Sequence, residues 1–258
     1  EGQLDIGEMI GANILAARAM APVIAVCQQT EGWMRAEQAS KTIEDFNRIP
    51  FEKFEGSAFE KYTGRLEFRD VTFNYPAKET PVLEKLSLSL TPGEVLCVTG
   101  ANGSGKTTLA KLITGLLEPN EGYVSVDGVN LKQLSLEWWR KQIIYLPQEP
   151  KFLEGSIREN FLAVDGAVSD DRIREVLTDA GLHQEIDKSV GGLDQVINTT
   201  GSSLSLGVRR RLALARALII QGKIAILDEP TEGIDAKGAE SVYKVMSDLS
   251  AAGITLII

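Results

Sequence analysis

The fold of this chain is decided by the stretch Gly100-Ala101-Asn102-Gly103-Ser104-Gly105-Lys106-Thr107. It fits the pattern G-x-x-x-x-G-K-[ST], which is typical of a phosphate-binding loop. Such a loop follows a buried strand and opens a helix. The flanking residues agree with both, because residues 94–99 are mostly apolar and residues 108–113 are apolar at helical spacing. We therefore predict an α/β fold with a phosphate-loop NTPase core.

The residue types in this loop suit a nucleoside triphosphate with Mg²⁺. Glycines let backbone N–H groups turn inward around phosphate oxygens, and the helix start adds unpaired N–H groups and a positive dipole end. We expect Lys106 to reach the β- and γ-phosphates, the Thr107 hydroxyl to hold Mg²⁺, and Thr108 to complete the nucleotide site. A glycine-rich turn that binds nothing is the weaker alternative, because every position of the pattern and both flanking elements fit.

Two acidic residues follow a second buried strand. Residues 224–227 read Ile-Ala-Ile-Leu, and Asp228 and Glu229 come directly after them. In a phosphate-loop protein, an Asp at such a strand end holds the water shell of Mg²⁺, and a neighbouring Glu can act as general base on an attacking water. Two surface carboxylates at a strand end are the alternative. The phosphate loop earlier in the chain favours the catalytic interpretation.

Composition describes an ordinary globular protein, with 43% hydrophobic and 24% charged residues among 258. The formal net charge of −9 gives no electrostatic support to nucleic-acid binding, so no nucleic-acid partner is expected. Cys27 and Cys97 are far apart, and we interpret both as reduced, buried thiols. The run Arg209–Arg211 is interpreted as a solvated or ion-paired helix face.

The N-terminal segment differs from the rest. Residues 10–26 are mostly apolar but are interrupted by polar Asn13 and Arg18 and by Pro22, and residues 28–48 are polar and helix-prone up to Pro50. It lacks the features of a signal peptide. An amphipathic helix, a core helix, and the tail of a membrane helix that continues into the cytoplasm all remain open. Since the chain starts without Met, an upstream part is expected.

Residues 51–64 are charged and without a clear period, and we interpret them as a linker. Strands are then predicted at 65–74, 82–90, 94–99, 123–126, 143–146, 223–228 and 254–258. Between residues 149 and 219 helical patterns appear at 157–161, 173–180 and 206–219, with no good strand between them. This region is predicted to be a helical insertion.

From about Arg65 to its end, the chain resembles the ATPase domain of ABC transporters. Tyr75 matches the aromatic residue that stacks on adenine in that family, although a strand aromatic in the core is the alternative. Leu146-Pro147-Gln148 resembles the glutamine loop, so Gln148 would contact Mg²⁺ and the attacking water. Residues 151–160 resemble the segment that follows that loop in exporters, and Asp235 matches the aspartate of the D-loop. The resemblance implies an N-terminal antiparallel β subdomain and a helical subdomain at about 149–219.

The hallmark of the family is altered here. Leu204-Ser205-Leu206-Gly207-Val208 stands where Leu-Ser-Gly-Gly-Gln is usual. Ser205 and Gly207 are kept, and by resemblance this helix start would face the γ-phosphate bound by the other subunit. Leu206 and Val208 replace Gly and Gln, which places the strength of this half-site in question. The chain ends at Ile258, before the family's switch histidine, and we do not expect His183 to be its equivalent.

The N-terminal residues 2–15 and 18–22 resemble the last membrane helix of exporters of the type I protein-secretion group, which favours a peptide or protein cargo. The predicted domains are thus 1–50, the end of that helix with a cytoplasmic extension, the linker 51–64, and an ATP-binding domain at 65–258. The implied cofactors are ATP and Mg²⁺.

The first interpretation of function is the ATP-binding and hydrolysing motor domain of an ABC exporter. Its implied partners are a second ATPase domain, as a homodimer, and the transmembrane domain of the same transporter, at the cytoplasmic face of the bacterial inner membrane. A soluble ABC ATPase that works on DNA or ribosomes is opposed by the apolar N-terminus and the negative charge. A regulatory, non-hydrolysing subunit is favoured by Leu206 and Val208 and opposed by Glu229.

Overall fold

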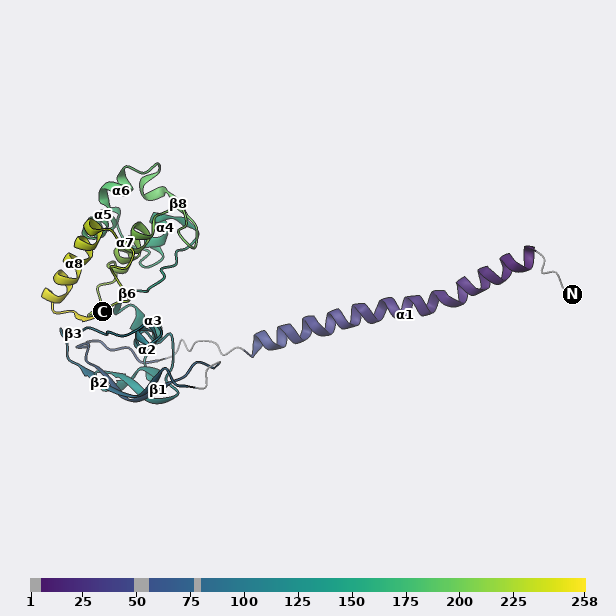
Figure 1. Ribbon diagram of the computed structural model, residues 1–258, viewed down its shortest axis with the longest axis horizontal. Helices are drawn as coiled ribbons and strands as arrows, with labels where there is room; N and C mark the ends of the chain where they lie inside the picture. The colour runs from purple at the N-terminus through teal and green to yellow at the C-terminus, as the bar shows by residue number, and fades with distance from the viewer. Residues whose placement is uncertain (1–5, 49–55, 77–79) are drawn as a thin grey trace. The chain divides into compact units, whose positions relative to one another are not determined.

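The computed structural model describes residues 6–48, 56–76 and 80–258. The chain divides into two compact units, residues 1–52 and residues 53–258, drawn in Figure 1. Three sequence predictions lie wholly or partly outside the described residues: Pro50 as a helix end, the linker at its residues 51–55, and the membrane-helix resemblance at Gly2–Asp5.

The first unit is a single long helix, α1 (Ile6–Asn47), drawn in purple and blue in Figure 1. Two helix-prone stretches were expected, and the helix runs through both without a break, with Pro22 inside it. Its 42 residues correspond to about 60 Å at the usual rise per residue. By length and composition, α1 is the one helix in the described residues that is long and apolar enough to cross a membrane.

The second unit contains a four-stranded antiparallel sheet in the order β2-β1-β4-β5. Its strands are β1 (Leu66–Phe73), β2 (Leu83–Leu90), β4 (Glu121–Val126) and β5 (Val129–Asn130). In β1, buried residues alternate in two stretches, Leu66 with Phe68 and Val71 with Phe73, and the pairing register shifts between the two stretches. Leu66 lies opposite Leu90 on one side and Val126 on the other, and all three side chains are buried.

A second sheet is parallel throughout, in the order β3-β10-β9-β6. Its strands are β3 (Val95–Leu96), β10 (Thr255–Ile257), β9 (Ile224–Leu227) and β6 (Ile143–Leu146). Every residue of β9 is buried, so its sequence is continuously apolar rather than alternating. Ligands of open parallel sheets bind outside the carboxyl ends of the strands. The phosphate loop, Gln148 and Asp228 each follow a strand of this sheet, so the topology brings them to one edge.

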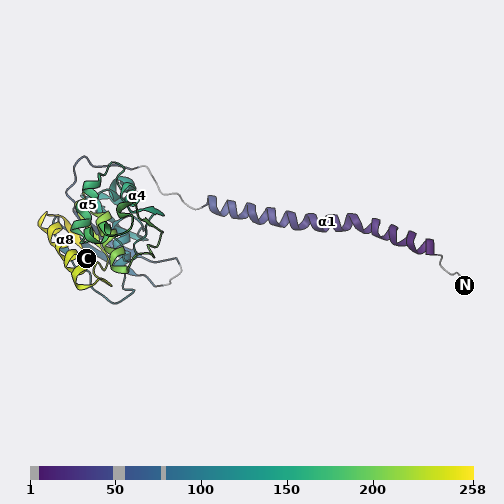
Figure 2. The same ribbon diagram turned by 90° about the horizontal axis from the view of Figure 1, so that it is seen from above.

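This unit also contains helices. They are α2 (Lys106–Ile113), α3 (Leu136–Arg140), α4 (Ile157–Leu162), α5 (Asp170–Asp179), α6 (His183–Asp187), α7 (Leu206–Ala217) and α8 (Ala236–Ala251), with short 3-10 turns at Leu131–Gln133 and Gly192–Asp194. Figure 1 shows α5, α6 and α7 at one end of the unit and β1 and β2 at the other, and Figure 2 gives the view from above.

Two hydrophobic cores hold these elements together. In one, side chains of α4, α5, α7 and α8 pack around β6 and β9, with Phe161 and Leu214 fully buried. The other joins the two sheets through α2 and α3, where Trp139 is fully buried and its Nε1 donates to the Ile113 carbonyl at 2.7 Å. The parallel sheet contributes to both cores, and this fixes its carboxyl edge against the helices on either side.

The prediction of buried thiols was wrong, because Cys27 and Cys97 are both free and exposed. The strand expected at 94–99 is formed only by Val95 and Leu96, although the Glu94 carbonyl and the Val98 N–H also bond to the segment that contains β10. Cys97 comes after this short edge strand, where no second neighbouring strand of the described residues covers it. An apolar run therefore did not guarantee burial at this edge.

The region between β6 and β9 is helical as expected, with two additions. A two-residue antiparallel pair joins β7 (Gly155–Ser156) to β8 (Val196–Ile197), where no strand was expected. The helix α6 was also missed. Elements of two to five residues are too short to show a hydrophobic period, so pattern analysis does not detect them.

Candidate active site

The phosphate-loop pattern connects β3 to α2 and leaves the start of that helix uncapped. Gly105 occupies the N-cap position with φ 100° and supplies no side-chain hydrogen bond to the first turn. This positive φ favours glycine, since an L side chain is strained there. At Gly100, an added Cβ would lie 2.6 Å from Ser104 Oγ, so a side chain would not fit without movement. The first N–H groups of α2 therefore remain available to an anion.

A cavity of about 300 Å³ lies beside this loop. The residues that line it come from four separate segments: Tyr75, Val82, Asn102, Gly103, Gly105, Lys106, Thr107, Thr108, Gln148 and Glu229. A neighbouring cavity of about 160 Å³ is lined by Lys106, Asp228 and Glu229 among others. Most predicted nucleotide and catalytic residues thus border one of two cavities at the carboxyl edge of the parallel sheet.

Some predicted site residues lie elsewhere. Gly100, Ala101 and Ser104 belong to the loop but line neither cavity, although Gly100 and Ala101 hold Lys106 through their carbonyls. Ser205 and Gly207 also line neither of them. Within a single chain, the altered hallmark is therefore not part of the cavity formed by the loop.

Lys106 is held over its own loop. Its Nζ donates to the carbonyls of Gly100 at 3.0 Å and Ala101 at 3.3 Å, and it lies 3.8 Å from Glu229 Oε1. Two of these contacts are to neutral acceptors, which bind an ammonium group less strongly than a phosphate oxygen does. The Lys106 ammonium group thus lies within ion-pair distance of the Glu229 carboxylate, and an anion such as phosphate can replace its two carbonyl partners.

Gln148 and Glu229 are far apart in sequence, yet they form a direct hydrogen bond. Gln148 Nε2 donates to Glu229 Oε2 at 2.6 Å. The strand register explains this, because Leu146 of β6 pairs with Leu227 of β9 and each predicted site residue comes two positions later. Gln148 and Glu229 therefore lie at the same height beyond the ends of two neighbouring parallel strands. The pair places an amide and a carboxylate side by side at the cavity wall.

Asp228 has one oxygen that needs a partner. The residue is 8% exposed, its backbone N–H donates to the Leu146 carbonyl, and its buried Oδ2 has no hydrogen-bond partner among the described residues. Such an orphaned oxygen is costly unless water or a cation satisfies it. Burial, together with the charge of Asp228, raises the pKa of neighbouring Tyr145 to about 12.

This donor set fits Mg²⁺. Mg²⁺ prefers oxygen ligands and is usually held by one or two carboxylates together with waters and substrate phosphates. Thr107 and Gln148 line the larger cavity and Asp228 the smaller. In the part of the chain that the structure describes, no three His, Cys, Asp or Glu side chains form a metal cage of protein groups alone. A cation here would share its shell with the nucleotide.

Tyr75 packs against the antiparallel sheet and also borders the larger cavity. Its ring packs edge-on against Phe73 with centroids 4.9 Å apart, and its hydroxyl lies 3.2 Å from Thr108 Oγ1. The residue is half-buried and lines the larger cavity. The ring is therefore anchored by the sheet on one side and borders the space beside the loop on the other.

The altered hallmark forms the start of α7. Ser205 is the N-cap residue, and its hydroxyl accepts a hydrogen bond from the Val208 N–H at 3.3 Å. Leu206 is 42% exposed and lies over Gly233, where an added Cβ would come within 2.5 Å of the leucine side chain. Asp235, the predicted D-loop aspartate, caps α8 by accepting from the Gly238 N–H at 3.3 Å.

Nothing in the sequence indicated that Arg210 contacts the loop after β9, next to the site. Of the two forms expected for this run, solvated or ion-paired, Arg210 and Arg211 take the ion-paired one, and each is only 6% exposed. Arg210 contacts the backbone of Glu229 and the side chain of Glu232. Three consecutive arginines in the sequence do not show which of them faces a neighbouring loop, so this contact was not predicted.

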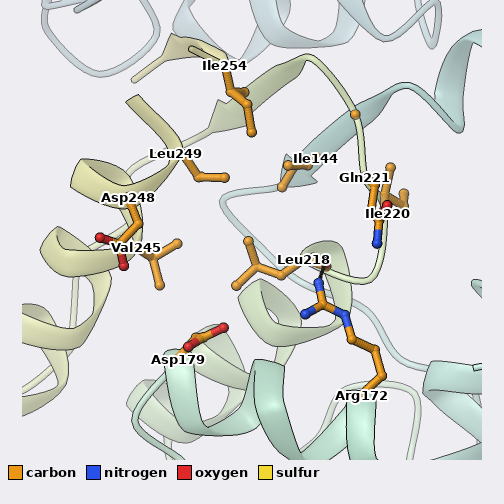
Figure 3. Close-up of a pocket in the computed structure, with 11 residues that line it drawn as sticks. Ile144, Arg172, Asp179, Leu218, Ile220, Gln221, Val245, Asp248, Leu249 and Ile254 are labelled. Atoms are coloured by element: carbon orange, nitrogen blue, oxygen red, sulfur yellow. Dashed lines mark hydrogen bonds between the residues drawn. The ribbon is translucent and has the colours of Figure 1, made fainter. Parts of the chain in front are cut away.

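A further cavity of about 320 Å³ lies away from these residues. Figure 3 shows its apolar residues from several elements, with Arg172 and Asp179 of α5 and Asp248 of α8 around them. It contains residues near the amino ends of β6, β9 and β10 and none of the predicted site residues. It also lacks the glycine loop and free helix start that suit a phosphate, so the cavities beside α2 fit an anionic ligand better.

The comparison with family models finds one match. Residues 83–232, more than half of the chain, match the model described as ABC transporter. The matched range includes the glycine loop, Gln148, the altered hallmark, Asp228 and Glu229.

Among known proteins, the chain is similar to several bacterial translocation proteins. It is 31% identical to the toxin RTX-I translocation ATP-binding protein of Actinobacillus pleuropneumoniae and 32% identical to the alpha-hemolysin translocation ATP-binding protein HlyB of Escherichia coli O157:H7. It is 30% identical to the leukotoxin translocation ATP-binding protein LktB of Mannheimia haemolytica. Each similarity covers 100% of this chain and 36% of the relative, so the chain spans about a third of the length of these proteins.

Proposed function

Because the chain belongs to the ABC transporter family, we propose that it binds and hydrolyses ATP as the motor domain of an exporter. One observation carries the proposal. The cavity beside α2 gathers the glycine loop, Tyr75, Gln148 and Glu229 from four segments of the chain, and Gln148 contacts Glu229 directly. These are the groups that phosphoryl transfer to water requires: a phosphate cradle, a cation and a base.

Each group has a role that its position supports. The loop N–H groups and Lys106 bind the phosphates, and Tyr75 stacks on the adenine. Thr107, Gln148 and Asp228 would hold Mg²⁺, which would neutralise negative charge at the phosphates. Glu229 accepts a proton from the water that attacks the γ-phosphate, and Gln148 orients that carboxylate through their 2.6 Å hydrogen bond.

Two copies would complete the site. Ser205 and Gly207 line neither cavity of their own chain, and Ser205 and Leu206 are exposed at the start of α7. We infer that this helix start faces the γ-phosphate bound by a second ATPase domain, in a homodimer. The two subunits would then each supply half of both sites.

The whole transporter is also part of the proposal. The helix α1 is long and apolar enough to span a membrane, which supports a transmembrane domain in the same protein and a place for the ATPase at the cytoplasmic face of the bacterial inner membrane. The names of the similar proteins mention toxins and their translocation. We infer a peptide or protein cargo, moved by a type I secretion route.

The domain arrangement follows from the same reasoning. We propose that residues 1–50 are the end of the last membrane helix with its extension, 51–64 a linker, and 65–258 the ATP-binding domain. The antiparallel sheet would be its N-terminal β subdomain, and about 149–219 its inserted helical subdomain.

A regulatory domain with weakened hydrolysis is the second candidate. Leu206 lies against Gly233 in the loop that follows β9, so the hallmark differs from the usual one in shape as well as in sequence. Phosphate release from MgATP separates the two candidates, because a regulatory domain would bind the nucleotide and release little phosphate.

The proposal is tested by MgATP titration in a calorimeter with Lys106→Ala. Lys106 is the cation beside the loop, and a hydrogen bond to a charged group contributes about 1.5–3 kcal/mol, so we expect affinity to fall roughly 10- to 100-fold. The control is Lys111→Ala, on the same helix but lining neither cavity, which should bind within about twofold of the parent. Equal affinity of both variants would refute the site.

A further inference from the structure

A buried arginine on α7 holds the loop that follows β9. Arg210 is 6% exposed. Its Nη1 donates to the Glu229 carbonyl at 3.0 Å and also to the Glu232 carbonyl, and its Nη2 donates to Glu232 Oε2 at 2.7 Å. The Arg210 guanidinium thus donates hydrogen bonds to three acceptors in the loop. One acceptor is the backbone carbonyl of Glu229, the proposed general base.

That backbone needs to be held. Glu229 has φ 51°, one of four non-glycine residues with positive φ in the described part of the chain. A left-handed conformation costs an L-residue about 1–2 kcal/mol and persists only where the surroundings enforce it. The Glu232 N–H closes a turn on the Glu229 carbonyl at 3.2 Å, and Arg210 donates to the same oxygen. The arginine therefore secures the conformation that points the Glu229 side chain toward Gln148.

Glu232 is the counter-ion in this arrangement. A buried guanidinium is costly unless it is paired, and Glu232 is its carboxylate partner. The hydrogen bond with Arg210, together with the positive charge of that residue, holds the pKa of Glu232 below its usual range.

Arg211 offers a comparison within the same helix. It is equally buried, donates to the Gly181 carbonyl at 2.8 Å, and pairs with Glu185 at 3.1 Å. These contacts reach the turn after α5 and the helix α6 rather than the loop after β9. Two neighbouring arginines with the same burial thus stabilise different parts of the molecule, and only one of them touches Glu229.

We propose that Arg210, with Glu232, is a positioning residue for hydrolysis, which fixes the Glu229 backbone so that its carboxylate faces Gln148 and the cavity. This inference rests on the proposed function, since it assumes that Glu229 acts on water. It goes further by assigning the orientation of the base to a charged pair between α7 and the loop after β9. The pair also connects the start of α7 mechanically to the catalytic carboxylate.

The test compares Arg210→Gln, Arg210→Lys and Glu232→Gln with the control Glu185→Gln, all in the full chain. MgATP dissociation constants and single-turnover hydrolysis rates are measured for each. Displacement of a catalytic group by about 1 Å can cost up to roughly 100-fold in rate. We expect Arg210→Gln to hydrolyse about 10- to 100-fold more slowly with affinity within twofold. Arg210→Lys should fall between it and the parent, because one ammonium cannot reach all three acceptors.

The control distinguishes positioning from stability. Glu185→Gln removes the counter-ion of Arg211 in the same way as Glu232→Gln removes that of Arg210, so it should lower the melting temperature comparably and leave the hydrolysis rate unchanged. If both glutamate variants lower the melting temperature and neither slows hydrolysis, the pair is structural only and the inference is wrong. If Arg210→Gln does not fold, Glu232→Gln and Arg210→Lys decide the question.

Amide hydrogen exchange gives a readout that does not depend on turnover. Arg210→Gln should speed exchange in residues 229–234 by about tenfold, while Glu185→Gln should not. Unchanged exchange in that loop would overturn the inference. A parent chain that fails to bind MgATP would instead refute the proposed function, while the exchange result still tests the grip of Arg210 on the loop.

Discussion

Replacing Glu229 with Gln should separate ATP binding from ATP hydrolysis. The substitution keeps the length of the side chain, and the new amide oxygen can still accept the hydrogen bond that Gln148 Nε2 donates at 2.6 Å. Only the ability to take a proton from water is lost. General base catalysis typically contributes about 10²–10⁴-fold, or roughly 2.7–5.4 kcal/mol, so hydrolysis should fall by that factor.

The affinity for MgATP should rise in the same variant. Glu229 Oε1 lies 3.8 Å from Lys106 Nζ and competes with phosphate for it. Both side chains are partly exposed, so the pair contributes no more than about 1 kcal/mol, and its removal should tighten binding by up to about fivefold. A carboxylate facing the γ-phosphate is removed as well, which acts in the same direction.

The assay measures phosphate release in a single turnover and the dissociation constant by calorimetry, for the parent and for Glu229→Gln. The exposed Glu240 on α8 supplies a matched control, because Glu240→Gln makes the same chemical change away from both cavities. A Glu229→Gln variant that hydrolyses at the parental rate would show that another group activates water. Weakened binding would show that Glu229 supports the nucleotide rather than opposing it.

Other predictions follow from the same contacts. Tyr75→Ala should weaken MgATP binding about tenfold, since stacking of a base on an aromatic ring contributes roughly 1–3 kcal/mol, whereas Tyr75→Phe keeps the ring and should bind within about twofold; calorimetry compares the two. Restoring Gly at Leu206 and Gln at Val208 together should raise steady-state hydrolysis in an assembled pair, and flat or reduced activity would contradict the idea of an impaired half-site. The contribution of Glu232 to stability should depend on pH: its pKa is lowered in the folded state, so the contribution is present above the usual value of 4.5 and is lost as pH falls through the lower folded value. The melting-temperature difference between the parent and Glu232→Gln should therefore persist at pH 5 and shrink at more acidic pH.

The sequence predicted the parts of the site that depend on chain order. Two local patterns predicted their surroundings correctly. The glycine loop lies between a strand and a helix, and the two acidic residues follow a buried strand. The ABC transporter family, inferred from the loop, Gln148 and Asp228-Glu229, is confirmed. The contact between Gln148 and Glu229 was not predicted, because chain order does not show that the two strands before these residues are neighbours.

The sequence did not predict which side chains of a helix or strand pack against a neighbouring element. Arg209, Arg210 and Arg211 look alike in the sequence, yet Arg210 reaches the loop after β9 and Arg211 reaches α6. Cys97 follows an apolar run but lies exposed, because β3 pairs on one side only in the described residues. These outcomes are set by tertiary packing, which leaves no period in the sequence.

The level pairing of β6 and β9 also determines where the chain can change in length. One extra residue between Leu146 and Gln148 would move the amide about 3.3 Å along the strand direction, out of reach of Glu229. The length of the segment that joins β6 to β9 does not affect this alignment of Gln148 with Glu229. An insertion at an exposed turn within it, such as around Val190, which is 98% exposed, would leave both strand ends in register. Insertions next to Pro147 and Asp228, between the strand ends and the paired side chains, would therefore break the contact. The helical region between β6 and β9 can vary in length without that effect.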